Sequence, residues 1–473
     1  MRAFAFVLAL AILTLAAPAA AEVTYEVFVR AFADGDGDGI GDLAGLTGKL
    51  PYIKDLGADA VWLMPIFPSP SYHGYDVTDY YGINPDYGSM EDFEALIEAA
   101  RGLGLRVYLD LPINHTSIEH PWFDANPDYY VWADENANLE LRVWGEKVWK
   151  PRRGGHYYAI FWDGMPDLNY DNPLVREEMK AVAKFWLEAG ADGFRLDAAS
   201  HIYGMGERGN RQDIERSARW WEEFKAACEA VDPDCYLLGE AWESLDKRAE
   251  LLPGLHAAVN FDVGEEIAAF IKGGGGGKLY VRNRMKAYAA YDGVRGGIPD
   301  APFLTNHDQP RVFSTLSAKP ERAKLAASML LTLPGNPILY YGEEIGMMGA
   351  KPDEELRTPM LWGNGDPMQT DWHPSRYNAR TIPLSEQAGD PDSLYNHYRR
   401  LLAFRREHPV LTEGAMGAAE VGNDTVVAYT LTDGDAEALI LHNHTSITQA
   451  TDLCELPPYT SAVFIGGEGW SFP

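Results

Sequence analysis

Three carboxylates in this chain follow apolar runs, and their types and neighbours point to acid–base chemistry. The segment 193–197, Gly-Phe-Arg-Leu-Asp, reads as a buried strand, so Arg195 and Asp197 share one face because side chains alternate along a strand. We expect Arg195 to keep Asp197 ionised and to lower its pKa, which suits a nucleophile. Taken alone, such a pair is more often a structural salt bridge, so the other two carboxylates decide the interpretation.

Glu240 and Asp308 end two further apolar runs. Glu240 stands two residues before Trp242, and desolvation there is expected to raise its pKa and keep it protonated for general acid catalysis. Asp308 follows His307 directly. A nucleophile and an acid about 5–5.5 Å apart are what retaining glycoside hydrolysis requires, and neighbouring strands can supply that separation.

The elements that must position these carboxylates alternate as a β/α repeat. The sequence predicts strands over 25–30, 60–64, 106–111, 193–197, 236–239, 258–261, 302–305 and 337–341. Helices are predicted over 90–102, 173–188, 213–231 and 322–333, where apolar residues recur at three- and four-residue spacing. Eight such strands fit an α/β fold, the (β/α)8 TIM barrel, whose active site lies at the carboxyl ends of the strands.

Two segments interrupt or follow this repeat. Residues 112–171 are rich in aromatic residues and proline, and a connection this long needs structure of its own. We expect them to form a subdomain inserted after the third strand, so that the barrel comprises 22–111 and 172–409. From 410 to 473 the pattern changes to short alternating strands, which predicts a C-terminal antiparallel β-sandwich.

The first 21 residues have the pattern of a secretory signal peptide, with Arg2, an apolar run and a small-residue end. The alternative is a membrane anchor, but the run is short for a spanning helix. We therefore expect a secreted protein, extracellular or periplasmic, with no membrane association after cleavage. The barrel starts almost directly after this segment and leaves no room for an N-terminal dimerising module, so we expect a monomer.

Charge and cysteine content narrow the functional classes. The 473 residues include 40 basic and 70 acidic ones, a formal charge of −30, which repels nucleic acid and favours a neutral substrate. Three dispersed cysteines are too few for a disulfide framework. Stability must therefore come from a hydrophobic core.

An aspartate-rich loop follows the first predicted strand. Its alternating residues offer oxygen ligands to a hard cation, and its glycines allow sharp turns, as in the first half of an EF-hand loop. We predict a structural Ca²⁺ site there; the alternative is a solvated acidic turn. The expected ligands are Asp34, Asp36, Asp38, Ile40 and Asp42.

Five short motifs in the right order resemble the α-amylase-type glycoside hydrolases, family 13 of those enzymes. Residues 110–115, 193–201, 238–242 and 303–308 are similar to its first four conserved regions. Residues 165–169 resemble the version found in the subfamily intermediate between oligo-1,6-glucosidases and neopullulanases. Residues 335–347 are similar to the eighth-strand segment.

This resemblance implies a role for each matching residue. Asp197 would attack the anomeric carbon, Glu240 would act as acid and then base, and Asp308 would stabilise the distorted sugar. Asn114 would bind a Ca²⁺ between barrel and insert. In the implied substrate site Arg195 orients Asp197, Tyr75 stacks beneath the sugar, and two histidines bond its hydroxyls; the full set is Tyr75, Asp76, His115, Arg195, His201, His307 and Arg357.

Three positions bear on specificity. Ala198 follows the nucleophile where α-1,6-acting relatives usually carry valine, which favours α-1,4 action. Ser200 stands where many α-amylases carry lysine before His201. Asp76 is the residue that exo-acting relatives pair with an arginine to close the pocket, and Arg357 is the candidate partner.

We therefore expect a retaining α-glucan hydrolase, an α-amylase acting on α-1,4 bonds of starch and maltooligosaccharides. The alternative within the class is an exo-acting α-glucosidase or a cyclomaltodextrinase/neopullulanase-like enzyme with transglycosylation. A non-catalytic carbohydrate-binding relative is the alternative outside it, but such proteins tend to lose one of the three carboxylates.

Overall fold

The computed structural model describes residues 22–204, 212–273, 276–295 and 298–473. The predicted signal peptide, 1–21, lies outside these residues. Among the helices that are described, none has the length and apolar character needed to span a bilayer.

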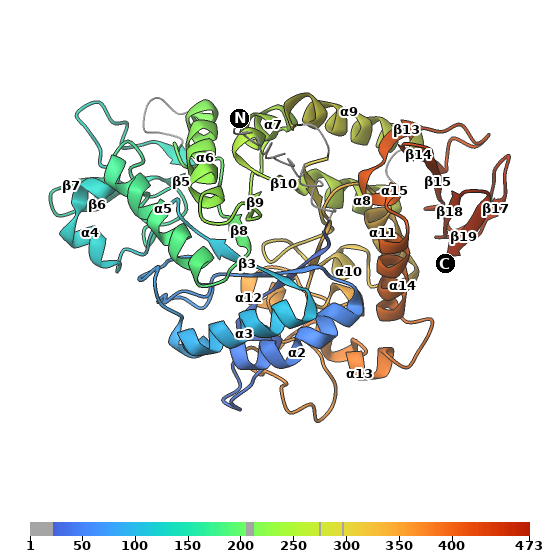
Figure 1. Cartoon of the computed structure of the whole chain (residues 1–473), viewed down its shortest axis with the longest axis horizontal. Helices are drawn as coiled ribbons and strands as arrows, with labels where there is room; N and C mark the ends of the chain where they lie inside the picture. The colour runs from blue at the N-terminus through green and yellow to red at the C-terminus, as the bar shows by residue number, and fades with distance from the viewer. Residues whose placement is uncertain (1–21, 205–211, 274–275, 296–297) are drawn as a thin grey trace, which may run out of the picture.

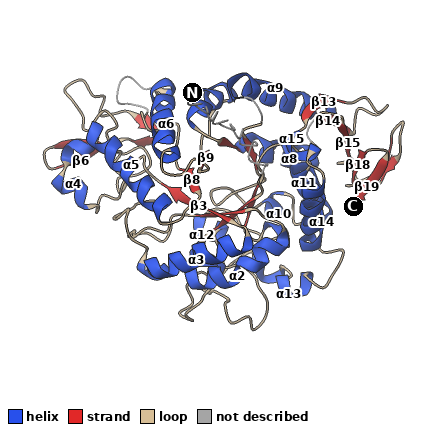
Figure 2. Cartoon of the chain, in the orientation of Figure 1, coloured by secondary structure: helices blue, strands red, loops and turns tan. Residues whose placement is uncertain are grey.

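Eight parallel strands form the centre of the molecule, with helices around them (Figures 1 and 2). Hydrogen bonds join them in the order β11-β10-β9-β8-β3-β2-β1-β12, and an isolated parallel bridge between Phe303 and Ile338 links the two ends. The predicted TIM barrel is therefore confirmed. The strands are β1 (Thr24–Val27), β2 (Ala60–Leu63), β3 (Arg106–Leu111), β8 (Gly193–Leu196), β9 (Tyr236–Gly239), β10 (Ala257–Asn260), β11 (Asp300–Pro302) and β12 (Ile338–Tyr340).

The barrel strands are buried on both faces. Successive side chains along a strand point to opposite faces, and each face packs in its own hydrophobic cluster. One face contributes Trp62, Tyr108, Leu238 and Phe303 to a cluster within the barrel strands. The other face, including Phe194, packs in the larger core with the surrounding helices. Charged side chains on the inward face must find partners at the strand ends, which is where the site forms.

The surrounding helices carry the apolar spacing that the sequence predicted. Ser89 and Asp92 form a capping box at the start of α3, and Gly104 ends it in a left-handed conformation. The longer helices are α2 (Leu43–Leu56), α3 (Met90–Leu103), α5 (Pro173–Glu188), α6 (Ile214–Glu229), α7 (Leu245–Leu251), α8 (Phe261–Ile271), α9 (Gly277–Arg295), α11 (Pro320–Leu331) and α14 (Leu394–Glu407). Short helical turns are α1 (Val29–Phe32), α10 (Val312–Thr315), α12 (Asp353–Leu356), α13 (Leu384–Gln387) and α15 (Val410–Glu413).

The segment after β3 forms small elements of its own at one flank of the barrel (Figure 1). These are α4 (Pro121–Ala125), β4 (Arg142–Val143), β5 (Glu146–Lys147), β6 (Trp149–Arg152) and β7 (Gly155–Tyr158). They enclose a separate cluster that includes Val131, Trp149 and Tyr158. A bridge between His115 and Asp167 joins the two ends of the segment beside the barrel mouth.

The C-terminal strands lie at the opposite flank (Figure 1). Five of them form an antiparallel sheet: β13 (Ala415–Ala418), β14 (Val427–Asp433), β15 (Ala436–His442), β18 (Ser461–Ile465) and β19 (Glu468–Phe472). The two-stranded ribbon of β16 (Gln449–Ala450) and β17 (Glu455–Leu456) packs Leu456 against Ala428 and Leu441 of that sheet. In the predicted C-terminal sandwich, the layer that faces the five-stranded sheet is thus this short ribbon.

Candidate active site

Arg195 is the centre of the site and is buried in the barrel mouth. Its Nη1 donates to Asp110 Oδ1 at 2.8 Å and to Asp197 Oδ1 at 2.7 Å. Its Nη2 pairs with Glu240 Oε1 at 2.8 Å. These carboxylates come from the carboxyl ends of β3, β8 and β9, so one guanidinium contacts side chains from three neighbouring strands.

The predicted lowering of the Asp197 pKa is wrong. Burial raises the pKa of Asp197 to about 6, although Arg195 lowers it. Because Arg195 is shared by three carboxylates, it does not fully offset the desolvation of any one of them. Burial also raises the pKa of Glu240, as expected, with Arg195 opposing the shift.

The surroundings of Glu240 differ in one respect from those predicted. Trp242 is 59% exposed and stacks on Phe261 with centroids 4.4 Å apart, so it does not enclose the carboxyl group. Instead Glu240 Oε2 accepts a hydrogen bond from the Ala198 N–H at 3.0 Å. Ala198 has a φ of 48°, a left-handed conformation that a residue with a Cβ rarely adopts.

Asp308 faces this group with its own cations. Arg357 Nη2 donates to Asp308 Oδ1 at 2.9 Å, and His307 Nε2 lies 3.2 Å from Oδ2. Burial raises the pKa of Asp308, but His307 and Arg357 outweigh burial and hold that pKa well below its usual range. Burial also lowers the pKa of His307, yet Asp308 and Glu26 outweigh it and raise that pKa to about 10.

One cavity of about 950 Å³ contains the three carboxylates. Arg357, which contacts both Asp308 and Asp353, lines it next to Asp308, and Trp144, which packs on His201, lines it together with that histidine. The structure thus brings Asp197, Glu240 and Asp308 together, as the sequence predicted.

Tyr75 and His115 form the wall beside Asp197. The Tyr75 hydroxyl donates to Asp110 Oδ2 at 2.9 Å and lies 2.7 Å from His307 Nε2, and its ring stacks on the His307 ring. His115 Nε2 lies 3.2 Å from the Tyr75 carbonyl oxygen. Both line the cavity, where the resemblance placed them.

The suggested pair of Asp76 and Arg357 does not form. Asp76 accepts hydrogen bonds from the hydroxyls of Ser69, at 2.6 Å, and Ser71. Arg357 pairs with Asp308 instead. The aspartate is engaged by its own loop, so an Asp76–Arg357 pair does not close the cavity.

Two partner residues were missed by sequence reasoning. Glu26 lies in β1 and contacts His307 Nδ1 at 2.5 Å, and Asp110 accepts from Arg195. Glu26 is an acid within an otherwise apolar strand, which is a signal of a buried charge. Asp110 likewise lies within an apolar strand, β3.

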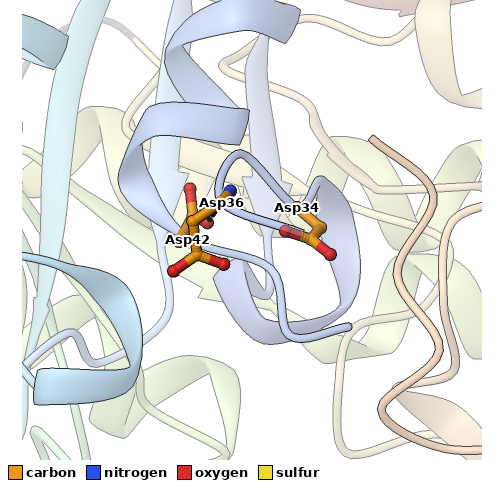
Figure 3. Close-up of side chains that lie close together, drawn as sticks. All are labelled: Asp34, Asp36 and Asp42. Atoms are coloured by element: carbon orange, nitrogen blue, oxygen red, sulfur yellow. Dashed lines mark hydrogen bonds between the residues drawn. The ribbon is translucent and has the colours of Figure 1, made fainter. Parts of the chain in front are cut away.

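The aspartate loop after α1 is a separate acidic group (Figure 3). Oxygens of Asp34, Asp36 and Asp42 lie within 4.8 Å of one another, the one such group of acidic, histidine or cysteine ligands in the described residues. Asp38 is exposed and its Oδ1 accepts from the Ile40 N–H at 2.7 Å, outside that group. Three oxygen donors at this spacing fit a hard cation.

Asn114 lies at the junction of barrel and insert. Its Nδ2 donates to Asp167 Oδ2 at 3.1 Å, and the residue is buried. This contact ties the insert to β3 in the same way that the His115–Asp167 bridge does.

A TIM barrel with three carboxylates in one cavity at the strand ends defines a glycoside hydrolase of the barrel class. Comparison with known proteins agrees: the sequence matches "Alpha amylase, catalytic domain" over residues 26–414. The chain therefore belongs to the α-amylase family of glycoside hydrolases and is an enzyme of that type.

Three relatives illustrate the range of this family. The chain is 44% identical to "Alpha-amylase 3" of Dictyoglomus thermophilum, over 85% of this chain and 81% of the relative. It is 35% identical to a "4-alpha-glucanotransferase" of Thermotoga neapolitana, over 90% and 96%. The crystal structure of an α-amylase from H. orenii superposes with a TM-score of 0.86 at 41% identity, over 94% and 99%.

Proposed function

We propose that this protein is a retaining α-glucan hydrolase that cleaves α-1,4-glucosidic bonds of starch and maltooligosaccharides. The observation that carries the proposal is the shared guanidinium: Asp197 and Glu240 bond to different amino groups of Arg195. This arrangement fixes a nucleophile and an acid side by side in one cavity, as double displacement requires.

In the first step Asp197 Oδ attacks the anomeric carbon while Glu240 gives its proton to the leaving glycosidic oxygen. The raised pKa of Glu240 supports its protonated state before that step. In the second step Glu240 takes a proton from water, which attacks the same carbon and releases Asp197. The product keeps the α configuration.

Asp308 supplies negative charge next to the reacting sugar. His307 and Arg357 keep it ionised, so its charge is available to the oxocarbenium-like transition state and to the sugar hydroxyls. Tyr75, on the wall beside Asp197, offers its ring to the apolar face of the same sugar.

The names of the relatives support an α-glucan substrate, and product analysis tests it. We expect fast loss of starch–iodine colour, mixed oligosaccharide products, and a first product in the α configuration by NMR. Release of glucose alone from chain ends would favour the exo-acting alternative. Preference for cyclodextrin over starch would favour the cyclomaltodextrinase alternative. A β-configured first product would refute the retaining mechanism.

Transfer to a sugar acceptor is the second candidate activity. Two tryptophans line the cavity, Trp144 at 65% exposure and Trp242 at 59%, and exposed rings are platforms for sugars. A relative is a "4-alpha-glucanotransferase", which favours the same activity.

We also propose a structural Ca²⁺ in the aspartate loop, held by Asp34, Asp36 and Asp42. The support is their convergent carboxylate oxygens, which suit a hard cation. The ion would stabilise the loop that precedes α2, and no catalytic step involves it.

Secretion is proposed from the first 21 residues, whose pattern is that of a signal peptide. Mass spectrometry of the mature protein from its native host tests cleavage near Ala21. Retention of Met1 in a membrane fraction would favour the anchor.

A further inference from the structure

The cavity has two chemically different sides. Near Asp308 the cavity cations are Lys351, which contacts Asp353, and Arg357, which pairs with Asp308. Beyond Glu240 lies the side where a leaving group must depart, because Glu240 is the proton donor in the proposed function. Lys247 on α7 lines the cavity and bonds Glu243, which stands three residues after Glu240, so its ammonium group is the one we assign to that side.

A hydrogen-bond network holds this ammonium at the cavity edge. Lys247 Nζ donates to Gln212 Oε1 at 2.9 Å and to Glu243 Oε2 at 2.8 Å. Gln212 Nε2 in turn donates to Glu243 Oε1 at 2.5 Å and lies 3.4 Å from His201 Nδ1. These bonds connect α7 to the loop after β8, on which Ala198 and His201 stand.

The network differs from an ordinary surface ion pair. A Lys–Glu pair four residues apart on a helix stabilises a protein by a few tenths of a kcal/mol and is usually mobile. Here the Glu243 side chain is only 12% exposed, and Gln212 bridges both partners. The bonds from Lys247 to Gln212 and Glu243 use two of its three ammonium N–H groups, so the third N–H can donate to a ligand.

The neighbouring groups make Lys247 the charged donor of this wall. Burial lowers the pKa of His201 to about 4, so its ring is neutral at pH 7. Trp144 packs on His201 with centroids 5.7 Å apart and presents an exposed ring beside it. An apolar ring next to a cationic donor matches a sugar, which has an apolar face and a rim of hydroxyls.

We propose that Lys247 is the specificity-determining residue for the sugar on the leaving-group side, with Gln212 and Glu243 as positioning residues for its ammonium. The ligand class is a glucosyl or maltooligosaccharide acceptor. This inference rests on the proposed function and adds to it the site that selects between water and a sugar in the second step.

The transfer step balances without a further reactant. The acceptor hydroxyl oxygen attacks the anomeric carbon of the glycosyl enzyme and forms the new C–O bond. The ester bond to Asp197 breaks and its electron pair returns to the carboxylate. Glu240 takes the hydroxyl proton, as it does from water in hydrolysis.

The test measures how one intermediate divides between two fates. α-Maltosyl fluoride serves as donor and 4-nitrophenyl α-glucoside as acceptor. Fluoride release counts the glycosyl enzyme formed, and chromatography of chromophoric oligosaccharides counts transfer. Because both fates start from the same intermediate, their ratio does not depend on the amount of folded enzyme.

Lys247→Met is expected to lower the ratio of transfer to hydrolysis about tenfold, the effect of losing one charged hydrogen bond. Lys247→Arg keeps the charge and is expected to retain a ratio within about threefold of the wild type. The matched control is Lys184→Met, which removes an exposed pair with Glu188 on α5, outside the cavity, and should leave the ratio unchanged.

An unchanged ratio in Lys247→Met would overturn the inference. So would a wild-type enzyme that releases fluoride but forms no chromophoric transfer product. A wild-type enzyme that releases no fluoride would instead refute the proposed function, so the two failures are distinguishable.

Discussion

The catalytic cavity and the aspartate loop each gather three or more carboxylates, but they balance the charge differently. In the cavity, buried cations balance the negative charge: Arg195 contacts Asp197, and Arg357 contacts Asp308. In the loop, backbone N–H groups face the carboxylates instead; for example, the N–H groups of Gly37 and Gly39 donate to Asp34. Among the described residues, no lysine or arginine forms an ion pair with Asp34, Asp36 or Asp42.

The difference shows where each group obtains its counter-charge. The cavity is balanced by the chain itself, so its carboxylates are held in place before substrate arrives. The loop has dipoles but no full positive charge, so it either stays solvated or takes a cation from solution. Removing a carboxylate should therefore abolish function in the first group and lower stability in the second.

The largest effect should come from the cavity. Asp197→Asn is expected to reduce starch hydrolysis about 10⁴-fold or more because the nucleophile is lost, with the melting temperature not lowered. Glu240→Gln should reduce it about 10²- to 10⁴-fold through loss of the acid. With α-maltosyl fluoride, whose leaving group needs no proton, fluoride release by Glu240→Gln should suffer less than starch hydrolysis. Either variant keeping most of its turnover on starch would contradict the assignment.

The next effect belongs to the loop. If Asp34, Asp36 and Asp42 bind Ca²⁺, removal of the ion by a chelator should cost about 2–3 kcal/mol at 100-fold saturation and lower the melting temperature by several degrees. Added Ca²⁺ should restore the melting temperature. In Asp34→Asn the chelator should have no further effect. A wild-type melting curve that does not respond to chelation would show that the loop is simply solvated.

The smallest effect is the pH dependence that Asp197 contributes. Its pKa is about 6 in the folded protein against 3.8 ordinarily, so the folded state favours its protonated form and loses that advantage as pH rises through 6. Asp197→Asn should therefore be more stable than the wild type at pH 8, and the margin should be smaller at pH 4. Denaturation by urea at the two pH values measures the difference. A variant that is less stable at pH 8 would reverse the sign and contradict the argument.

Much of the barrel follows from local patterns. The strands at 106–111 and 236–239 and the helix at 173–188 have the predicted ends, because each has a continuous apolar or amphipathic pattern with clear stops. The strand predicted at 302–305 instead spans Asp300–Pro302. There the apolar run continues into the loop that carries His307, so hydrophobicity alone does not locate the strand end.

The site was less accessible to sequence reasoning. Asp197 and Glu240 could be found because each directly follows a strand, and Asp308 because it stands in the loop after one. The pKa values of all three depend on partners far away along the chain. Glu26 contacts His307 across 281 positions, and Arg195 is shared among three strands. Such sharing arises because the closed barrel brings distant strands together. It explains why the pKa of Asp197 is raised, whereas the sequence predicted that it would be lowered.

The left-handed backbone of Ala198 has a consequence for changing bond preference by engineering. Valine is the residue that α-1,6-acting relatives usually carry there, but a branched β-carbon is strongly disfavoured at a φ of 48°. Swapping in valine alone would strain the peptide that donates to Glu240, and so disturb the acid before it could redirect the enzyme to branch points. Changing linkage selectivity at this position therefore involves the backbone of the turn after β8 as well as the side chain.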